Sequence, residues 1–357
     1  MAYTTVNKST DHFNPKNYSG NGSTNNITGV GFQPDWVWIK QTNGTGNHHL
    51  YDVVRGATKY LESSSTAPEQ TQAAGLTAFG TDGFTLGSNG SVNSGSGGYN
   101  SWCWKAGNSS GSANNDGATA STVSVNNTAG FSIVKWVGTS GNTTVGHGLN
   151  TAPTFTIAKN LSTNGNNWIC YHQSVSPDYA VKLNISDAQS NSNNYWQSTA
   201  PTNSLLTFTG GTASNANGDN MIAYCFTEKP GYCKINKYDG NGSSNGNFIY
   251  LGFRPTYFLV KRYDSAGAWI IKDGLNSGAI VSAANTPDGR NPNETEYPKA
   301  NQTNVNNKAS AFGMDFVSNG IKIRGDNGEI NTNGGSYLYL ALGQTLVGTN
   351  NVPCNAR

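Results

Sequence analysis

The chain has 357 residues and a formal net charge of +2, and only 12% of its residues are charged. The basic residues stand singly rather than in a stripe or block, which argues against a nucleic-acid partner. No stretch approaches the roughly 20 apolar residues that a membrane-spanning helix needs. We therefore expect neither nucleic-acid binding nor membrane insertion.

Glycine occurs 44 times, and aromatic residues make up 11% of the chain. Glycine-rich polar tracts can indicate disorder, but disordered chains are poor in aromatic residues. Glycine and asparagine also tolerate the positive φ angles of tight hairpin turns. The composition therefore predicts an all-β protein with many short strands.

One segment occurs three times, and each copy is an apolar run bracketed by a proline and a lysine six residues apart. The pairs are Pro34 and Lys40, Pro153 and Lys159, and Pro255 and Lys261. A Tyr-x-Gly-Asn-Gly-Ser motif precedes the first and last copies, at residues 18–23 and 238–243. A spacing of about a hundred residues is the size of a domain rather than of a propeller blade. We expect three tandem β-sandwich or jelly-roll-like repeats.

Composition divides the chain into five segments. Residues 107–117 are rich in Gly, Ser and Asn, which is typical of a flexible linker. The join at residues 228–233 is much shorter. The expected segments are repeat 1 at 1–107, a linker at 108–130, repeat 2 at 131–230, repeat 3 at 231–345 and a C-terminal tail at 346–357.

Strands are expected where short runs of β-branched and aromatic residues lie between Gly/Asn clusters. In repeat 1 they are residues 27–32, 36–40, 50–54, 76–79, 84–86 and 99–105, with a short helix allowed only within 58–71. In repeats 2 and 3 they are residues 155–159, 168–171, 205–208, 221–226, 248–253, 257–262, 269–272, 321–324 and 337–342. Because proline has no N–H for a strand ladder, Pro34, Pro153 and Pro255 should each lie just before a strand.

Two of the five cysteines occupy equivalent places in their repeats. Cys103 lies between two tryptophans, and Cys225 lies between a tyrosine and a phenylalanine. Repeat 3 has Ala341 at this place, so no framework disulfide depends on it. A small thiol between aromatic residues on a strand indicates a buried, reduced core residue. No Cys/His spacing indicates a metal site, and no feature calls for a cofactor.

No catalytic constellation is evident. Asp52, His172 and Asp273 fall at equivalent repeat positions, which favours a structural or surface role over a unique catalytic one. Glycan hydrolysis needs two carboxylates roughly 5–10 Å apart. The one suspect is the acidic loop at residues 293–297, for which a solvated surface loop is the favoured interpretation. We assign no catalytic residues.

Ligand-binding candidates come from two polar, aromatic-containing segments. Tyr195 and Trp196 follow Asn194 in an amide-rich stretch and could stack on sugar rings, although we favour the alternative that Trp196 plugs one end of a sandwich core. The second segment is the long loop at 285–308, with Glu296 and Tyr297 as its candidates. These five residues are the predicted ligand contacts.

Several pieces of the chain resemble a repeat domain of virion proteins of marine tailed bacteriophages, often labelled tail fibre. The matching pieces are residues 18–23, 29–40, 54–61, 82–87, 102–107, 145–149, 223–226 and 250–255. The resemblance implies a non-enzymatic virion protein, with a tail-fibre or receptor-binding component as the first interpretation. A capsid decoration or head-fibre protein is the alternative, and a glycan depolymerase is a third.

The resemblance also sets expectations for partners and location. Other virion proteins, a host-surface glycan or receptor, and further copies of the chain, as in a trimer, are the expected partners. The polar N-terminus lacks the apolar core of a signal peptide. We therefore expect a virion protein that is assembled in the host cytoplasm.

Overall fold

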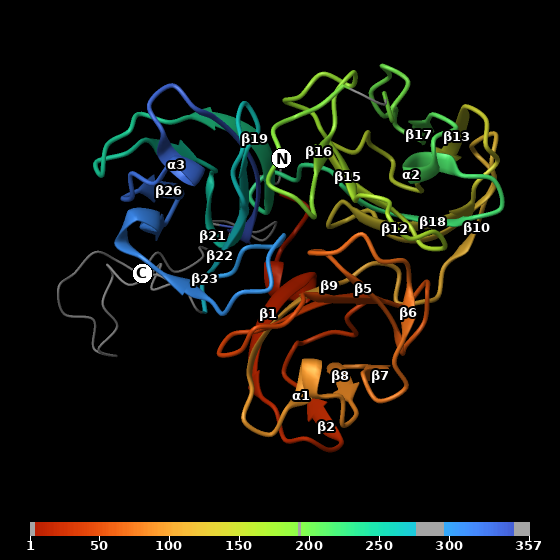
Figure 1. Cartoon of the computed structure of the whole chain (residues 1–357), viewed down its shortest axis with the longest axis horizontal. Helices are drawn as coiled ribbons and strands as arrows, with labels where there is room; N and C mark the ends of the chain where they lie inside the picture. Colours follow the sequence, from red (N-terminus) through yellow and green to blue (C-terminus); the bar gives the residue numbers. More distant parts are fainter. Residues whose placement is uncertain (1–3, 192–193, 276–295, 346–357) are drawn as a thin grey trace.

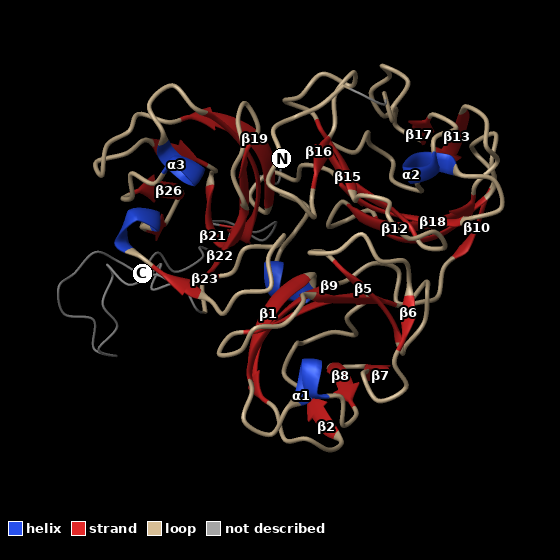
Figure 2. Ribbon diagram, viewed as in Figure 1, coloured by secondary structure: helices blue, strands red, loops and turns tan. Residues whose placement is uncertain are grey.

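The computed structural model describes residues 4–191, 194–275 and 296–345. Each repeat contains one large antiparallel sheet and one small sheet, and the three repeats surround a common centre (Figure 1). Strands dominate, and the α-helices are single turns (Figure 2). The predicted all-β, sandwich-like fold is thus confirmed. No helix among the described residues is long and apolar enough to cross a membrane.

Repeat 1 has a six-stranded sheet in the order β1-β9-β3-β4-β5-β6 and a small sheet in the order β2-β8-β7. The large sheet comprises β1 (Phe13–Ser19), β9 (Gly98–Trp104), β3 (Trp36–Gln41), β4 (His49–Asp52), β5 (Lys59–Glu62) and β6 (Gln70–Thr71). The small sheet comprises β2 (Asn25–Ile27), β8 (Gly83–Leu86) and β7 (Leu76–Gly80), with η1 (Ser9–Asp11) and α1 (Gly90–Asn93) outside the sheets.

Repeat 2 has a seven-stranded sheet in the order β10-β11-β12-β18-β14-β15-β16 and a pair, β13-β17. The large sheet comprises β10 (Ser112–Asn114), β11 (Ser121–Asn126), β12 (Phe131–Val137), β18 (Asn220–Phe226), β14 (Phe155–Asn160), β15 (Ile169–His172) and β16 (Val181–Lys182). The pair comprises β13 (Thr143–Gly146) and β17 (Leu205–Phe208), and α2 is Thr212–Asn215.

Repeat 3 has a four-stranded sheet in the order β19-β27-β21-β22 and a small sheet in the order β20-β26-β25. The large sheet comprises β19 (Cys233–Asp239), β27 (Ser336–Thr345), β21 (Phe253–Arg262) and β22 (Trp269–Asp273). The other elements are β20 (Phe248–Tyr250), β26 (Gly320–Ile323), β25 (Met314–Val317), the pair β23 (Glu296–Tyr297) and β24 (Asn307–Lys308), η2 (Ser310–Phe312) and α3 (Gly328–Asn331).

The central strand of each large sheet is apolar on both faces. Side chains alternate along a strand, so Trp36 and Trp38 of β3 enter the central cluster while Val37 and Ile39 face the small sheet of the same repeat. The equivalent strands β14 and β21 divide their side chains between the centre and their own small sheet in the same way. Each repeat is therefore a two-layer sandwich whose large sheet also packs on the other repeats.

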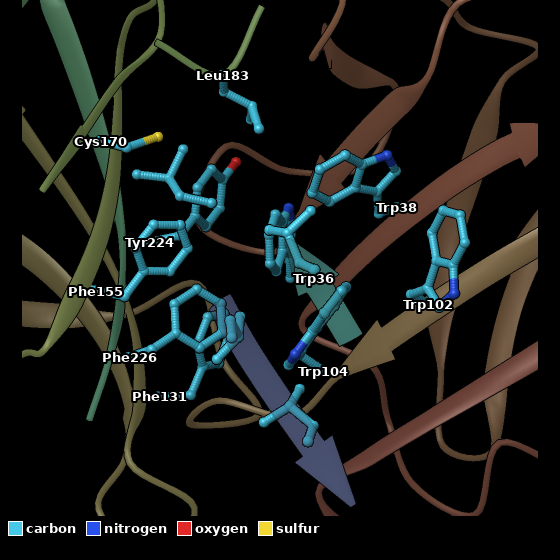
Figure 3. Close-up of a cluster of buried hydrophobic side chains, with 14 of the residues drawn as sticks. Trp36, Trp38, Trp102, Trp104, Phe131, Phe155, Cys170, Leu183, Tyr224 and Phe226 are labelled. Atoms are coloured by element: carbon cyan, nitrogen blue, oxygen red, sulfur yellow. The ribbon is translucent and has the colours of Figure 1, made fainter. Parts of the chain in front are cut away.

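All three repeats contribute side chains to one central core. Figure 3 labels members of this core from repeats 1 and 2. Trp36 stacks on Tyr224 of repeat 2 with ring centroids 4.4 Å apart, and Phe13 meets Tyr257 of repeat 3 edge-on at 5.5 Å. Burying large aromatic side chains is among the strongest favourable terms in folding. The expected series of tandem domains is thus a single body with a shared core.

In each repeat a buried asparagine of the one-turn helix hydrogen-bonds the backbone of a nearby loop. Asn331 accepts a hydrogen bond from the backbone N–H of Asn241 (2.9 Å) and donates to the oxygens of Ser243 (2.8 Å) and Gly325 (2.9 Å). Asn93 and Asn215 hold the equivalent loops of the other repeats. A Cβ at the neighbouring Gly240 would lie 2.3 Å from a backbone oxygen, so the loop comes too close for any other residue.

The structure differs from the sequence expectation over residues 108–130. β10 and β11 form there and extend the sheet of repeat 2 along the edge of β12. Val123 is buried in the core of repeat 2 and Val125 packs against it. The period-2 pattern of β11 was obscured by the surrounding Gly/Ser/Asn composition.

Two further local expectations are corrected. Residues 58–71 form β5 and β6 rather than a helix, and the intervening loop contacts repeat 2 through the Glu69 N–H and the Leu161 oxygen at 2.9 Å. Pro34 and Pro153 precede β3 and β14 as predicted, but Pro255 lies inside β21. The register shifts between Pro255 and Tyr257, and this bulge accommodates the missing N–H.

The prediction for the cysteines is confirmed. Cys103 and Cys225 are free and fully buried. Burial in apolar surroundings raises the pKa of each thiol to about 12, which keeps it protonated at neutral pH.

Candidate functional site

The lysine that ends each copy of the Pro-to-Lys segment is fully buried and contacts a neighbouring repeat. Lys40 lies 3.4 Å from the backbone oxygen of Thr303 in repeat 3. Lys159 donates to Thr66 O in repeat 1 at 3.1 Å, and Lys261 donates to Ser186 O in repeat 2 at 3.3 Å. Repeat 1 thus contacts repeat 3, repeat 3 contacts repeat 2 and repeat 2 contacts repeat 1. The three lysines close a ring.

A second ring of contacts runs in the same direction. Trp168 donates its indole N–H to the backbone oxygen of Glu62 in repeat 1 at 2.9 Å. Trp269 donates its indole N–H to the backbone oxygen of Lys182 in repeat 2 at 2.9 Å. At the equivalent place in repeat 1, His48 Nε2 lies 3.1 Å from the Lys299 oxygen of repeat 3. His48 Nδ1 accepts the Trp38 N–H at 2.7 Å, so Nε2 carries the proton and donates.

Asp52, His172 and Asp273 also bridge repeats. Tyr224 of repeat 2 donates its hydroxyl to Asp52 at 2.7 Å, and Trp102 of repeat 1 donates its indole N–H to Asp273 at 3.0 Å. Trp102 and Tyr224 occupy equivalent positions on their strands. The equivalent residue in repeat 3 is Leu340, whose side chain has no hydrogen-bond donor. There His172 of repeat 2 instead contacts the Tyr339 backbone oxygen at 3.3 Å.

Burial of these groups changes their protonation. Desolvation lowers the pKa of Lys40, Lys159 and Lys261 to about 8 each. It lowers the pKa of His172 to about 4, which keeps the imidazole neutral at neutral pH. These shifts resemble those of catalytic groups, but the side chains are 0–1% exposed and point into contacts between repeats. The position of these side chains indicates that they hold the repeats together inside the protein.

A cleft of about 420 Å³ opens on repeat 2 beside α2. Its walls are amides, hydroxyls, glycines and one aromatic ring, contributed by Gly165, Asn166, Asn167, Tyr195, Thr209, Gly211, Thr212 and Ala213. Gly165 has a φ of +86°, and a Cβ added there would meet no atom within 4 Å, so the rim is open at this point. None of these lining side chains is a carboxylate, imidazole or thiol. The chemistry of the walls suits a neutral polar ligand.

The hydrogen bonds of the cleft leave part of its polar surface for a ligand. Asn167 Oδ1 accepts from Asn184 at 2.8 Å, and within the described chain the Nδ2 of Asn167 makes no hydrogen bond. Asn166 Nδ2 donates to the Thr163 oxygen at 3.1 Å. The backbone oxygen of Tyr195 accepts from the Thr209 N–H at 3.0 Å, which fixes two walls relative to each other. Hydrogen bonds therefore join the walls of the cleft, while the Asn167 Nδ2 faces no partner within the described chain.

The structure separates the three candidates of the first segment. Tyr195 lines the cleft, although only 6% of it is exposed. Trp196 is 1% exposed and packs against Phe208, with ring centroids 5.4 Å apart, in the core of repeat 2. Asn194 is exposed, and its Oδ1 accepts the Ser198 N–H at 2.7 Å within a turn. The interpretation of Trp196 as a core plug agrees with this placement.

The second segment falls partly outside the description. Residues 285–295 and the side chain of Glu296 lie outside the described residues. Tyr297 is 3% exposed, stacks on Phe312 at 4.2 Å and lies under the Lys272 ammonium group. Tyr297 therefore belongs to the core of repeat 3 rather than to an open binding surface. Among the described residues no group of three or more His, Cys, Asp or Glu side chains could hold a metal ion.

Sequence reasoning missed an exposed aromatic pair. Phe248 and Tyr250 of β20 are 47% and 65% exposed, whereas Ile249 between them is buried. In repeat 1 the buried Ile27 at the end of the equivalent β2 is preceded by Asn26 and followed by Thr28. Comparing the outward positions of the repeats would have revealed the pair.

The chain belongs to the family described as Domain of unknown function (DUF7483), whose model matches residues 8–345. The match runs through all three repeats, so the family unit is the whole body around the shared core. No curated protein matches the chain.

Proposed function

We propose that the protein is a non-enzymatic structural protein of a tailed-bacteriophage particle, and that it acts as a tail-fibre or receptor-binding component. The sequence resemblance motivates the particle. The observation that carries the non-enzymatic role is that Asp52, His172 and Asp273 each bridge two repeats. These groups would otherwise be the first candidates for acid–base chemistry.

The binding role is supported by the cleft of repeat 2. Amide and hydroxyl groups around a tyrosine suit the hydroxyls of a sugar or the backbone of a protein loop. The low charge offers little electrostatic steering, so binding should depend only weakly on salt. Many copies on one particle would raise a weak single-site affinity through effective concentration.

The ring of contacts between repeats favours a second candidate, a capsid decoration protein. Lys40, Lys159 and Lys261 relate the three repeats in a cyclic order. A body with approximate threefold symmetry fits a site that is itself threefold, such as an axis of a shell. The two candidates differ in where the protein lies on the particle.

Localisation and adsorption together test the proposal. Gold-labelled antibody on purified particles should mark the tail if the protein is a fibre component and the head if it decorates the shell. The isolated protein should bind host cells, and the variant Thr212→Ala, at an exposed position of the cleft wall, should weaken that binding without changing the thermal unfolding midpoint. Thr122→Ala, on the β11 strand away from the cleft walls, is the matched control.

Absence of the protein from purified particles would overturn the virion proposal. Presence on particles without any binding to host cells would leave the decoration role and overturn the receptor-binding one. Release of reducing ends from host polysaccharide would contradict the non-enzymatic role.

A further inference from the structure

The three repeats present the same outward strand position with different side chains. The strands β2, β13 and β20 are equivalent, because Ile27, Val145 and Ile249 each fill the core at the same register. The residues before and after this core residue are Asn26 and Thr28 in repeat 1, Thr144 and Gly146 in repeat 2, and Phe248 and Tyr250 in repeat 3. Two repeats fold with small or polar residues there. The fold therefore does not require the aromatic pair.

Among the described residues, another segment pairs with the outer edge of this strand in repeat 2 but not in repeats 1 and 3. The Thr119 N–H donates to the Thr144 oxygen at 3.0 Å, and Thr119 forms a parallel bridge with Val145. In repeat 3, β20 is the edge of its small sheet. Within the described chain no strand pairs with its outer side. Phe248 and Tyr250, on the face of this edge strand, are 47% and 65% exposed.

The geometry arranges the two rings as a platform. Side chains two residues apart point to the same face of a strand, so both rings lie on the outer face of the small sheet. Tyr250 pairs with Gly320, which has no side chain. A Cβ added at Gly320 would lie 2.9 Å from Cζ of Phe248, which places that ring across the neighbouring strand. The tip of the Phe248 ring therefore lies over Gly320, and the residue remains 47% exposed.

Polar residues neighbour the aromatic pair across the sheet and along the sequence. Lys322 is the cross-strand partner of Phe248, and its ammonium group is already engaged by the Gly246 oxygen. The exposed loop at 241–245 precedes β20 and supplies asparagine amides and serine hydroxyls. An apolar surface of two rings framed by hydrogen-bonding groups matches a sugar, which has C–H faces and a rim of hydroxyls. The electron-rich ring faces attract the polarised C–H groups.

The size of the surface also favours a sugar over a protein. The exposed parts of the two rings amount to on the order of 200 Å², as judged from the area of an aromatic side chain. A stable protein interface needs about 800 Å² from each partner. A few sugar units cover the smaller area. We propose that Phe248 and Tyr250 form a stacking platform for a neutral glycan.

This inference deepens the proposed receptor-binding function and rests on it only for the biological role of the glycan. The test is affinity gel electrophoresis of the full chain in gels that contain laminarin, dextran, galactomannan or xyloglucan. We expect at least one of these neutral polysaccharides to retard the wild-type protein. Phe248→Asn with Tyr250→Thr, which installs the residues of repeat 1, should weaken retardation about tenfold or more, because two aromatic contacts are lost.

Two matched variants sharpen the result. Val137→Thr removes a different exposed apolar side chain, 53% exposed, and should leave retardation unchanged. Asn26→Phe with Thr28→Tyr transfers the pair to repeat 1 and should strengthen retardation by adding a second platform. All three variants should keep the thermal unfolding midpoint of the wild type, since each change is on an outward position.

Several outcomes would overturn the proposal. They are no retardation by any of the four polysaccharides, or retardation that survives removal of the pair. Loss of self-association in sedimentation velocity on removal of the pair, without polysaccharide binding, would assign it to a protein contact instead. Detection of the protein on particles does not depend on these results, so the virion proposal can stand while the platform fails.

Discussion

The ammonium group of Lys159, in repeat 2, donates a hydrogen bond of 3.1 Å to the backbone oxygen of Thr66, in repeat 1. It also donates to the backbone oxygen of Asn166 in its own repeat at 2.8 Å. Within the described chain no carboxylate lies within ion-pair distance of this group. Carbonyl dipoles alone therefore compensate the buried charge, and the pKa of Lys159 falls to about 8. The contact fastens two repeats at the cost of desolvating a charge.

Replacing this lysine should destabilise the whole body. Lys159→Met keeps much of the apolar stem but leaves the oxygens of Thr66 and Asn166 without their donor. Buried acceptors that lose a partner cost about 1–3 kcal/mol of unfolding free energy. Urea unfolding followed by fluorescence measures the change. Lys237→Met removes an exposed lysine and should have little effect, so equal losses in the two variants would contradict the role of the contact.

The pH dependence of that loss should have a definite sign. The pKa of Lys159 is about 8 in the folded protein and about 10.4 in an unfolded chain. Between these values the unfolded state binds more protons, so the lysine contributes more stability as pH rises. The difference in unfolding free energy between wild type and Lys159→Met should therefore grow from pH 8 to pH 10.

Taking this difference cancels the cysteines and tyrosines, which both proteins share and which act in the opposite direction. Urea midpoints at half-unit steps of pH measure it. A difference that stays flat or shrinks over this range would show that the folded lysine keeps its ordinary pKa.

The buried asparagine of repeat 3 should fix its loop. Asn331→Ala removes an acceptor for the Asn241 N–H and a donor to Ser243 O and Gly325 O. We expect a loss of about 1–3 kcal/mol in unfolding free energy and faster proteolytic cleavage within residues 241–245. Asn333→Ala, at a neighbouring exposed position, is the control. Equal protease resistance in both variants would refute the role of the asparagine.

Substitution of two aromatic residues should change the unfolding free energy by very different amounts. Trp196 is 1% exposed, whereas Tyr250 is 65% exposed. Trp196→Ala leaves a cavity against Phe208 and should cost about 3–5 kcal/mol of unfolding free energy. Tyr250→Thr should change stability by less than about 0.5 kcal/mol. Thermal and urea unfolding of the two variants distinguish a core residue from a surface one, and similar losses would contradict these assignments.

The sequence by itself determined the β class, the three repeats and the buried thiols. Those features follow from local patterns: alternation along a strand places Trp36 and Val37 on opposite faces, and Cys103 lies between two aromatic residues. The same local patterns misjudged residues 108–130, because the buried Val123 and the partly buried Val125 of β11 are surrounded by Gly, Ser and Asn.

Only the tertiary structure decided how the repeats combine and which polar groups are exposed. The sequence marks Lys159 as a repeated residue but does not show that its partner is Thr66, which lies 93 positions away. The sequence likewise offered Tyr297 as a ligand contact, whereas packing against Phe312 buries it in the core of repeat 3. Burial and hydrogen bonding between distant segments depend on packing in three dimensions, and a linear pattern carries information only about neighbours along a strand.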